Sequence, residues 1–60
     1  MARQIIIEFR RIGNSVRVAA VDTETGREAV IVGPASAGEA VLSRVARQKL
    51  LRLLEAESGD

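Results

Sequence analysis

The chain contains no cysteine and no histidine among its 60 residues. Disulfides are therefore impossible, and the usual zinc and iron–sulfur sites lack their ligands. Aromatic residues are almost absent as well, since Phe9 is the only one. Proteins that bind single-stranded nucleic acid without sequence preference stack bases on several aromatic side chains, and this chain has no such set. We expect no metal and no other cofactor.

An excess of one charge sign is also missing. Nine basic and eight acidic residues give a formal net charge of +1, whereas nucleic-acid-binding domains usually carry a clear basic excess. Long apolar runs are absent too, because Glu8 interrupts the segment after Ile5–Ile7. That segment predicts neither a signal peptide nor a membrane span. We expect a cytoplasmic protein, because cytosolic proteins rarely need cysteine pairs, with no membrane partner and without nucleic acid as its main partner.

The length of the chain predicts one small domain that spans residues 1–60. A domain of this size buries only about 60% of the surface of its unfolded chain. A single core of this kind rarely supplies more than roughly 3–5 kcal/mol. With disulfides and metals excluded, association with a second chain is the reinforcement that remains.

The first half of the chain alternates with the period of a β-strand. Two alternating runs, about 4–12 and 15–23, flank Gly13-Asn14, and a Gly-Asn pair in that position predicts a two-residue hairpin. Pairing Ile12 with Ser15 puts Phe9 opposite Val18 and Ile7 opposite Ala20. One face of the hairpin is then continuously apolar, so this register is favoured over a loop one residue longer.

A second hairpin is predicted around Gly26. A three-residue loop, Glu24 to Gly26, with a left-handed glycine fits a type I turn followed by a bulge. The third strand then covers about 27–33, with Ala20 opposite Val30 and Val18 opposite Val32. This register also sets Asp22 opposite Glu28, a mildly unfavourable pair of like charges that Arg27 or Arg3 could relieve.

Gly33-Pro34 ends the third strand, and a helix is predicted over about 36–57. Ser36 to Glu39 has the spacing of a capping box, in which the Ser side chain accepts from an early helical N–H. The helix carries a wide apolar arc, with Leu51 outside it. The predicted fold class is α+β: a three-stranded antiparallel β-meander of order 1-2-3 and a C-terminal α-helix. The helix is expected to pack on the sheet face formed by Ile5, Ile7, Phe9, Val18, Val30 and Val32.

Candidate sites for chemistry have structural explanations. Catalysis by acid–base or nucleophilic chemistry needs a base and an orienting group beside the reacting group, and without His or Cys the choice is small. Glu8 lies beside Arg10 and is expected to face Ala19, which favours a cross-strand salt bridge. The loop from Gly33 to Glu39 opens a helix and could hold an anion, but Glu39 would repel it. We expect no enzymatic activity and no catalytic residue.

The segment Arg10 to Val18, with Gly13-Asn14-Ser15 at its turn, resembles the hairpin of swapped-hairpin DNA-binding domains in bacterial antitoxins and transition-state regulators. Those domains continue with a Val/Ile-Pro pair, whereas here Ala19–Val21 extends the strand. The resemblance implies a nucleic-acid-binding regulator as the alternative function. Its contacts would be Arg10, Arg11 and Arg17.

A second resemblance spans the whole chain. The pattern Ile7-Glu8-Phe9, Ile12-Gly13, Val16–Asp22, Thr25-Gly26-x-Glu28, Val32-Gly33-Pro34 and Ala46-Arg47-x-Lys49-Leu50 resembles a family of short uncharacterised alphaproteobacterial proteins. The resemblance implies a β-meander with a helix. It also implies a dimer, which exchange of an element between chains could form. It implies no activity and no functional residues.

The predicted function is a small non-enzymatic interaction or scaffold protein that acts as a homodimer and binds a further protein of unknown identity. The sheet face opposite the helix is expected to stay apolar, and such a patch on a monomer favours association. The predicted dimer surface consists of Ile6, Val21, Ala29, Ile31 and Leu51.

Overall fold

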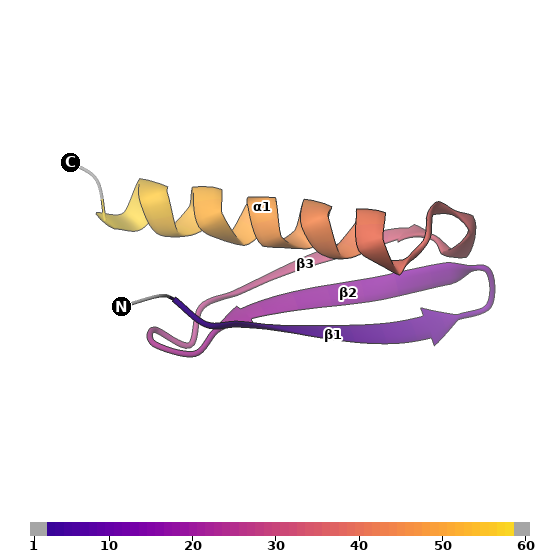
Figure 1. Cartoon of the computed structure of the whole chain (residues 1–60), viewed down its shortest axis with the longest axis horizontal. Helices are drawn as coiled ribbons and strands as arrows, with labels where there is room; N and C mark the ends of the chain where they lie inside the picture. The colour runs from indigo at the N-terminus through magenta and orange to yellow at the C-terminus, as the bar shows by residue number, and fades with distance from the viewer. Residues whose placement is uncertain (1–2, 59–60) are drawn as a thin grey trace.

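The chain folds as a three-stranded antiparallel sheet with one helix laid along one of its faces (Figure 1). The computed structural model describes residues 3–58. The elements are β1 (Ile5–Ile12), β2 (Ser15–Asp22), β3 (Glu28–Pro34), a short 3-10 helix η1 (Ala35–Ala37) and α1 (Glu39–Ser58). The strand order β1-β2-β3 confirms the predicted fold class.

The first hairpin has the predicted register. Ile12 lies opposite Ser15, Phe9 opposite Val18, and Ile7 opposite Ala20. Gly13 has a φ of 62°, and no non-glycine residue between 3 and 58 has a positive φ. In a type II′ turn, the first central residue has a positive φ and the second does not. The twist of such a turn matches that of the two strands.

The predicted register of the second hairpin is wrong by one residue. The N–H of Asp22 donates to the carbonyl O of Arg27 at 2.9 Å, so the loop has four residues, Thr23–Gly26. Ala20 therefore lies opposite Ala29. Because side chains alternate along a strand, one extra loop residue turns every side chain of β3 to the other face.

The side chain of Asp22 explains the extra loop residue. It is fully buried, and Oδ2 accepts hydrogen bonds from Thr25 Oγ1 at 2.7 Å and from the Thr25 N–H at 3.3 Å. An aspartate that binds backbone three residues ahead stabilises a turn. The predicted pair of Asp22 with Glu28 does not form, because Glu28 lies opposite Val21.

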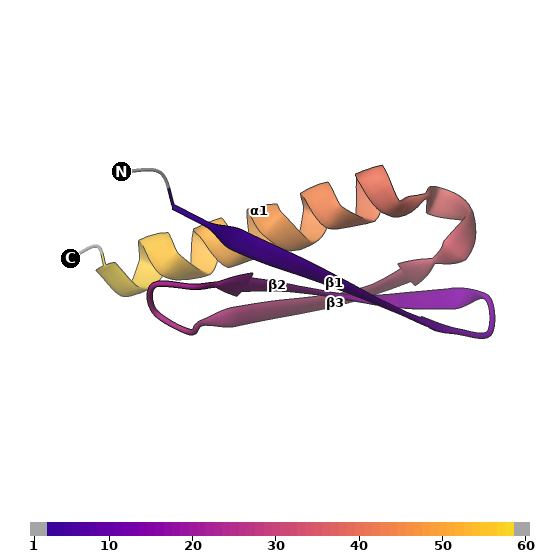
Figure 2. The same ribbon diagram turned by 60° about the horizontal axis from the view of Figure 1, so that its bottom comes forward.

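The core lies between α1 and the inner side of β2 and β3. Its buried apolar residues are Val16, Val18, Ala20, Ala29, Leu42, Ala46 and Leu50. The prediction that Val30 and Val32 face the helix is wrong, since Ala29 and Ile31 do so, and Val32 is 68% exposed. The helix lies mainly over β2 and β3 rather than β1, and β1 runs obliquely to the helix (Figure 2). Phe9 therefore stays 39% exposed although it shares the inner side of the sheet with Val18.

The helix begins later than predicted. The carbonyl O of Gly38 accepts the N–H of Leu42 at 3.1 Å, which makes Gly38 the residue that precedes the first helical turn. Ser36 lies in η1 and is exposed, so the capping box predicted for Ser36 and Glu39 does not form. A 3-10 turn after Pro34 brings the chain back over the sheet. Gly33 allows this approach, because a Cβ there would overlap the side chain of Leu42.

Candidate interaction surface

Strand β1 is an open edge of the sheet. The N–H of Thr23 donates to the carbonyl O of Gln4 at 3.2 Å, which shows that Gln4 directs its backbone groups toward β2. Antiparallel pairing alternates along a strand, so Ile5, Ile7 and Phe9 direct their N–H and C=O groups away from β2. Within residues 3–58 no strand pairs with that edge. These backbone groups are available to another chain.

The opposite edge, β3, is partly closed by the helix. The hydrogen bond from Asp22 to Arg27 fixes the alternation on this side, so Val30 directs its backbone groups outward. The ammonium group of Lys49 donates to the carbonyl O of Val30 at 2.9 Å. A lysine side chain that reaches an edge strand from a covering helix hinders further strand pairing. The two edges of the sheet therefore differ in their capacity to accept a strand.

The side of the sheet away from the helix, called the outer face below, is largely apolar. Ile6 is 52% exposed, Ile12 59% and Val32 68%. Val21 lies beside Ile6, Val30 precedes Val32 along β3, and both are half-buried. Arg10 and Arg17 separate Ile12 from this cluster. Large apolar side chains that adjoin on one face are typical of a surface that contacts another molecule.

The structure divides the five predicted dimer residues among three places. Ile6 and Val21 lie opposite one another on the outer face, as predicted. Ala29 is buried and Ile31 packs against the core, so their assignment to the surface is wrong. The four-residue loop before β3 causes this exchange of faces. Leu51 is 41% exposed on α1, which packs on the inner side of the sheet and not on the outer face.

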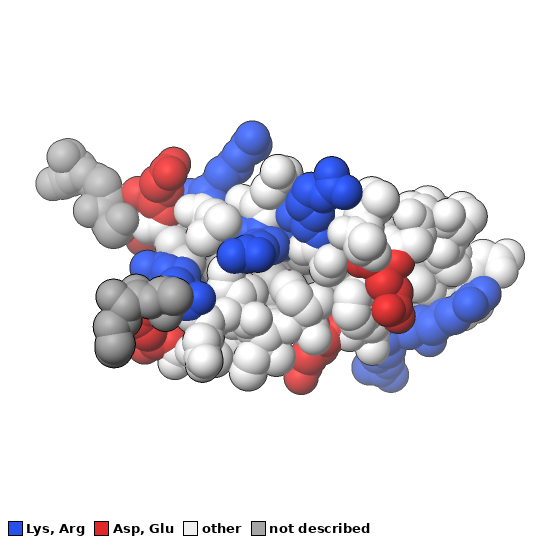
Figure 3. Space-filling model, viewed as in Figure 1, with Lys and Arg blue, Asp and Glu red and all other residues white. Residues whose placement is uncertain are grey.

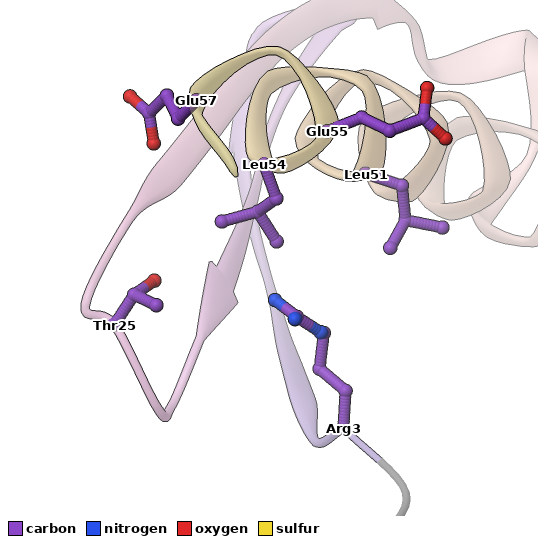
Figure 4. A pocket seen from close by; sticks show the side chains of 6 residues that line it. All are labelled: Arg3, Thr25, Leu51, Leu54, Glu55 and Glu57. Atoms are coloured by element: carbon purple, nitrogen blue, oxygen red, sulfur yellow. The ribbon is translucent and has the colours of Figure 1, made fainter. Parts of the chain in front are cut away.

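Leu51 belongs to a cleft of about 460 Å³ between the end of α1 and the beginning of β1 (Figure 4). Arg3 extends toward Leu54 across this cleft, and Nη1 of Arg3 donates to Asp22 Oδ2 at 3.0 Å. Glu57 forms an ion pair with Arg27 and so closes the helix end against the second hairpin. Within residues 3–58 no group of three acidic side chains is placed to hold a metal ion.

The carboxylate of Asp22 has a pKa below its ordinary value. The hydrogen bond from the Thr25 hydroxyl is the largest cause; burial opposes it, and the positive charge of Arg3 adds to it. Oδ1 of Asp22 has no hydrogen-bond partner among the described residues. Asp22 acts as the ionised centre that joins the beginning of β1 to the second hairpin.

The three arginines of the alternative prediction do not form one cluster. Arg10 and Arg17 lie directly opposite each other on the outer face. Arg11 alternates to the inner side and donates from Nε to the carbonyl O of Gly13 at 2.9 Å. Glu8 faces Ala19 as predicted, but, contrary to the prediction, Glu8 forms no salt bridge with any residue between 3 and 58. In the part of the chain that the structure describes, Arg10 and Arg17 form no ion pair.

Basic and acidic side chains are interspersed over the face shown in Figure 3, some side by side and others separated by uncharged surface. A band of basic residues, which would track a nucleic-acid backbone, does not occur on this face. Among the described residues, no helix combines the length and apolar character needed to cross a bilayer.

These features define a small α+β module of β-β-β-α order with one open strand edge and an uncovered apolar face. The sequence model of a family described as Domain of unknown function (DUF6898) matches residues 2–57. The chain belongs to this family, and the match covers all three strands and nearly the whole helix. The predicted membership of a family of uncharacterised proteins is thereby confirmed. Neither the curated proteins nor the solved structures contain a match to the chain.

Proposed function

We propose that the chain is a small, cytoplasmic, non-enzymatic bacterial interaction or scaffold protein that acts as a homodimer. The observation that carries the proposal is the state of β1. Within residues 3–58 no strand pairs with the open edge of β1, and the strand carries exposed apolar side chains on both of its faces, namely Ile6, Phe9 and Ile12.

The thin core supports this proposal. Among residues 3–58, Leu50 and Val18 are the largest apolar side chains that are fully buried, while seven large apolar residues are exposed. Burial of apolar surface stabilises by roughly 25 cal/mol per Å², so a second chain that covers some of these residues adds to a stability that is small for a domain of this length. Closed two-fold dimers are the commonest way in which soluble chains achieve this.

The mass in solution tests the proposal. Light scattering and sedimentation across a hundredfold dilution are expected to give twice the chain mass of 6.4 kDa at the higher concentrations. The melting temperature is expected to rise with concentration, because association stabilises the folded state by mass action. A mass of 6.4 kDa at every concentration, with an unchanged cooperative melt, would contradict the homodimer.

The alternative function is nucleic-acid binding by the hairpin of β1 and β2. Its support is the adjacent guanidinium groups of Arg10 and Arg17, which form no ion pair within residues 3–58. Arg11 on the other side of the sheet and a net charge of +1 weaken it, because affinity for nucleic acid follows the number of phosphates neutralised.

Fluorescence anisotropy with duplex and single-stranded DNA, at low and at physiological salt, separates the two functions. Weak binding that is equal in the wild type and in the double variant Arg10→Ala, Arg17→Ala is expected. Tight, salt-sensitive binding that this variant abolishes would place the alternative first.

A further inference from the structure

We infer that β1 of a second copy pairs antiparallel with β1 along its open edge, about a two-fold axis that passes through Phe9. The inference rests on the proposed homodimer and names its interface. The outward backbone groups belong to alternate residues, so the axis must pass through a residue rather than between two. An axis at Glu8 or Phe9, the two central positions of β1, pairs most of the strand. An axis at Ile7 or Arg10 pairs less of it, and at Arg10 the two Arg10 side chains would oppose each other.

The axis at Phe9 gives the most complementary pairing. Glu8 of each chain lies opposite Arg10 of the other, which forms two opposite-charge pairs on the outer face. Ile6 lies opposite Ile12, so two of the most exposed apolar side chains cover each other. Directly opposed side chains in an antiparallel pair have Cβ atoms about 4.5–5.5 Å apart, close enough for each of these contacts.

The axis at Phe9 also sets Ile7 opposite Arg11 on the inner side, but the registers at Glu8 and at Ile7 additionally bring like charges together. With the axis at Glu8, the two Glu8 carboxylates oppose each other, and Ile6 opposes Arg10. With the axis at Ile7, Arg3 opposes Arg11, and Ile6 opposes Glu8. Like charges directly opposite destabilise a pair of strands, so the charge pattern selects Phe9 as the axis.

The second copy also supplies a negative charge beside the neighbouring side chains of Arg10 and Arg17. These two guanidinium groups are cross-strand neighbours without an ion pair in the described part of the chain. In the paired dimer, Glu8 of the second copy lies on the other side of Arg10. The acid that the single chain does not bring to this like-charged pair then comes from its partner.

The inner side of β1 has space for the same arrangement. Because the helix lies mainly over β2 and β3, Phe9 is 39% exposed on the inner side of the sheet. At the two-fold axis it meets Phe9 of the second copy between the two helices. Paired aromatic rings in offset or edge-to-face contact contribute beyond their buried area.

Charge reversal tests the register. Glu8→Arg places Arg against Arg10 twice in its homodimer, and Arg10→Glu places Glu against Glu8 twice. Each variant is expected to raise the dissociation constant at least tenfold. An equimolar mixture of the two is expected to form a heterodimer, and the double variant Glu8→Arg, Arg10→Glu is expected to restore the homodimer. Restoration in the mixture shows that the single variants fold.

Two control variants accompany this test. Glu24→Arg makes the same change of charge on the exposed second hairpin, and the dimer is expected to persist. Val32→Asp introduces a charge on the outer face of β3, far from the open edge, and the dimer is again expected to persist.

Single cysteines measure the register directly, because the chain has no cysteine of its own. Phe9→Cys is expected to form a disulfide-linked dimer under mild oxidation. Hydrogen-bonded residues directly opposite have Cα atoms about 5.5 Å apart, within the disulfide range of about 4.4–6.8 Å. Ile7→Cys and Glu8→Cys report the two other registers, and both are expected to remain unlinked.

The outcomes separate this inference from the proposed function. A wild-type monomer at all concentrations overturns both. A wild-type dimer that Glu8→Arg leaves intact, or that Val32→Asp dissociates, keeps the homodimer and overturns pairing through β1. Faster linkage at position 7 or 8 than at position 9 overturns the axis at Phe9.

Discussion

Arg3, which precedes β1, donates a hydrogen bond of 3.0 Å to the buried carboxylate of Asp22 at the end of β2. The same carboxylate oxygen accepts from the hydroxyl and the N–H of Thr25. One side chain therefore holds the N-terminal end of the sheet to the second hairpin. Its ionisation contributes to the stability of both.

The stability of the fold is expected to fall in acid because of Asp22. Its folded pKa lies below the unfolded value of 3.8. When the folded pKa is lower than the unfolded pKa, the ionised carboxylate stabilises the folded state fully at any pH above the unfolded pKa. This contribution is lost as the pH falls through the folded pKa. Asp22→Asn is expected to lower stability at neutral pH and to flatten its decline below about pH 4. Urea unfolding across this range, with Glu39→Gln as the control, measures the effect; an unchanged acid slope would contradict it.

Gly33→Ala is expected to destabilise the chain by about 1–3 kcal/mol, as overpacking of a core does. The added Cβ would overlap the buried side chain of Leu42, and the helix or Leu42 must move. Leu42→Val in the same chain shortens the obstructing side chain, so the double variant is expected to lose less than the sum of the single variants. Additive losses in denaturant unfolding would show that the two residues do not interfere.

Leu50→Ala is expected to abolish cooperative unfolding. Leu50 is fully buried against the sheet, and deletion of such a side chain costs about 2–5 kcal/mol. This loss equals the whole stability expected of so small a core. Leu51→Ala is the matched control, because Leu51 is the next residue and 41% exposed. Similar thermal melts for the two variants would contradict this account of the core.

Arg27→Ala is expected to lower stability by less than about 1 kcal/mol. The side chains of Arg27 and Glu57 are 51% and 39% exposed, so water and salt screen their ion pair. The difference from wild type is expected to shrink as salt is added. Thermal unfolding at low and high ionic strength measures it, and a large loss that salt does not change would mean that Arg27 acts through packing.

The register of the first hairpin was predictable because both strands alternate and the loop has two residues. The register of the second was not. Residues 29–32 read Ala-Val-Ile-Val, and a strand that is apolar at every position fits either face equally well. The inward side chain of Asp22 decided the loop length. Its role could be found only through Thr25, which stands at the spacing of an aspartate-stabilised turn.

The candidate surface was partly predictable. The register of the first hairpin places Arg10 opposite Arg17, and alternation alone sends Arg11 to the other side. The exposure of Phe9 was not predictable, because it depends on which strands the helix covers. The position of the helix on the sheet follows from the close approach of Leu42 to Gly33. The periodicity of the sequence does not indicate this contact.

The hydrogen bond from Lys49 to Val30 sets a limit on the size of any assembly built by strand pairing. A two-fold contact through β1 uses that edge on both chains at once, and the edges that remain are the two copies of β3. On each of these, an ammonium group occupies the outward carbonyl that an incoming strand would need. Growth by strand pairing is therefore hindered after one addition, which favours a finite particle over a fibre.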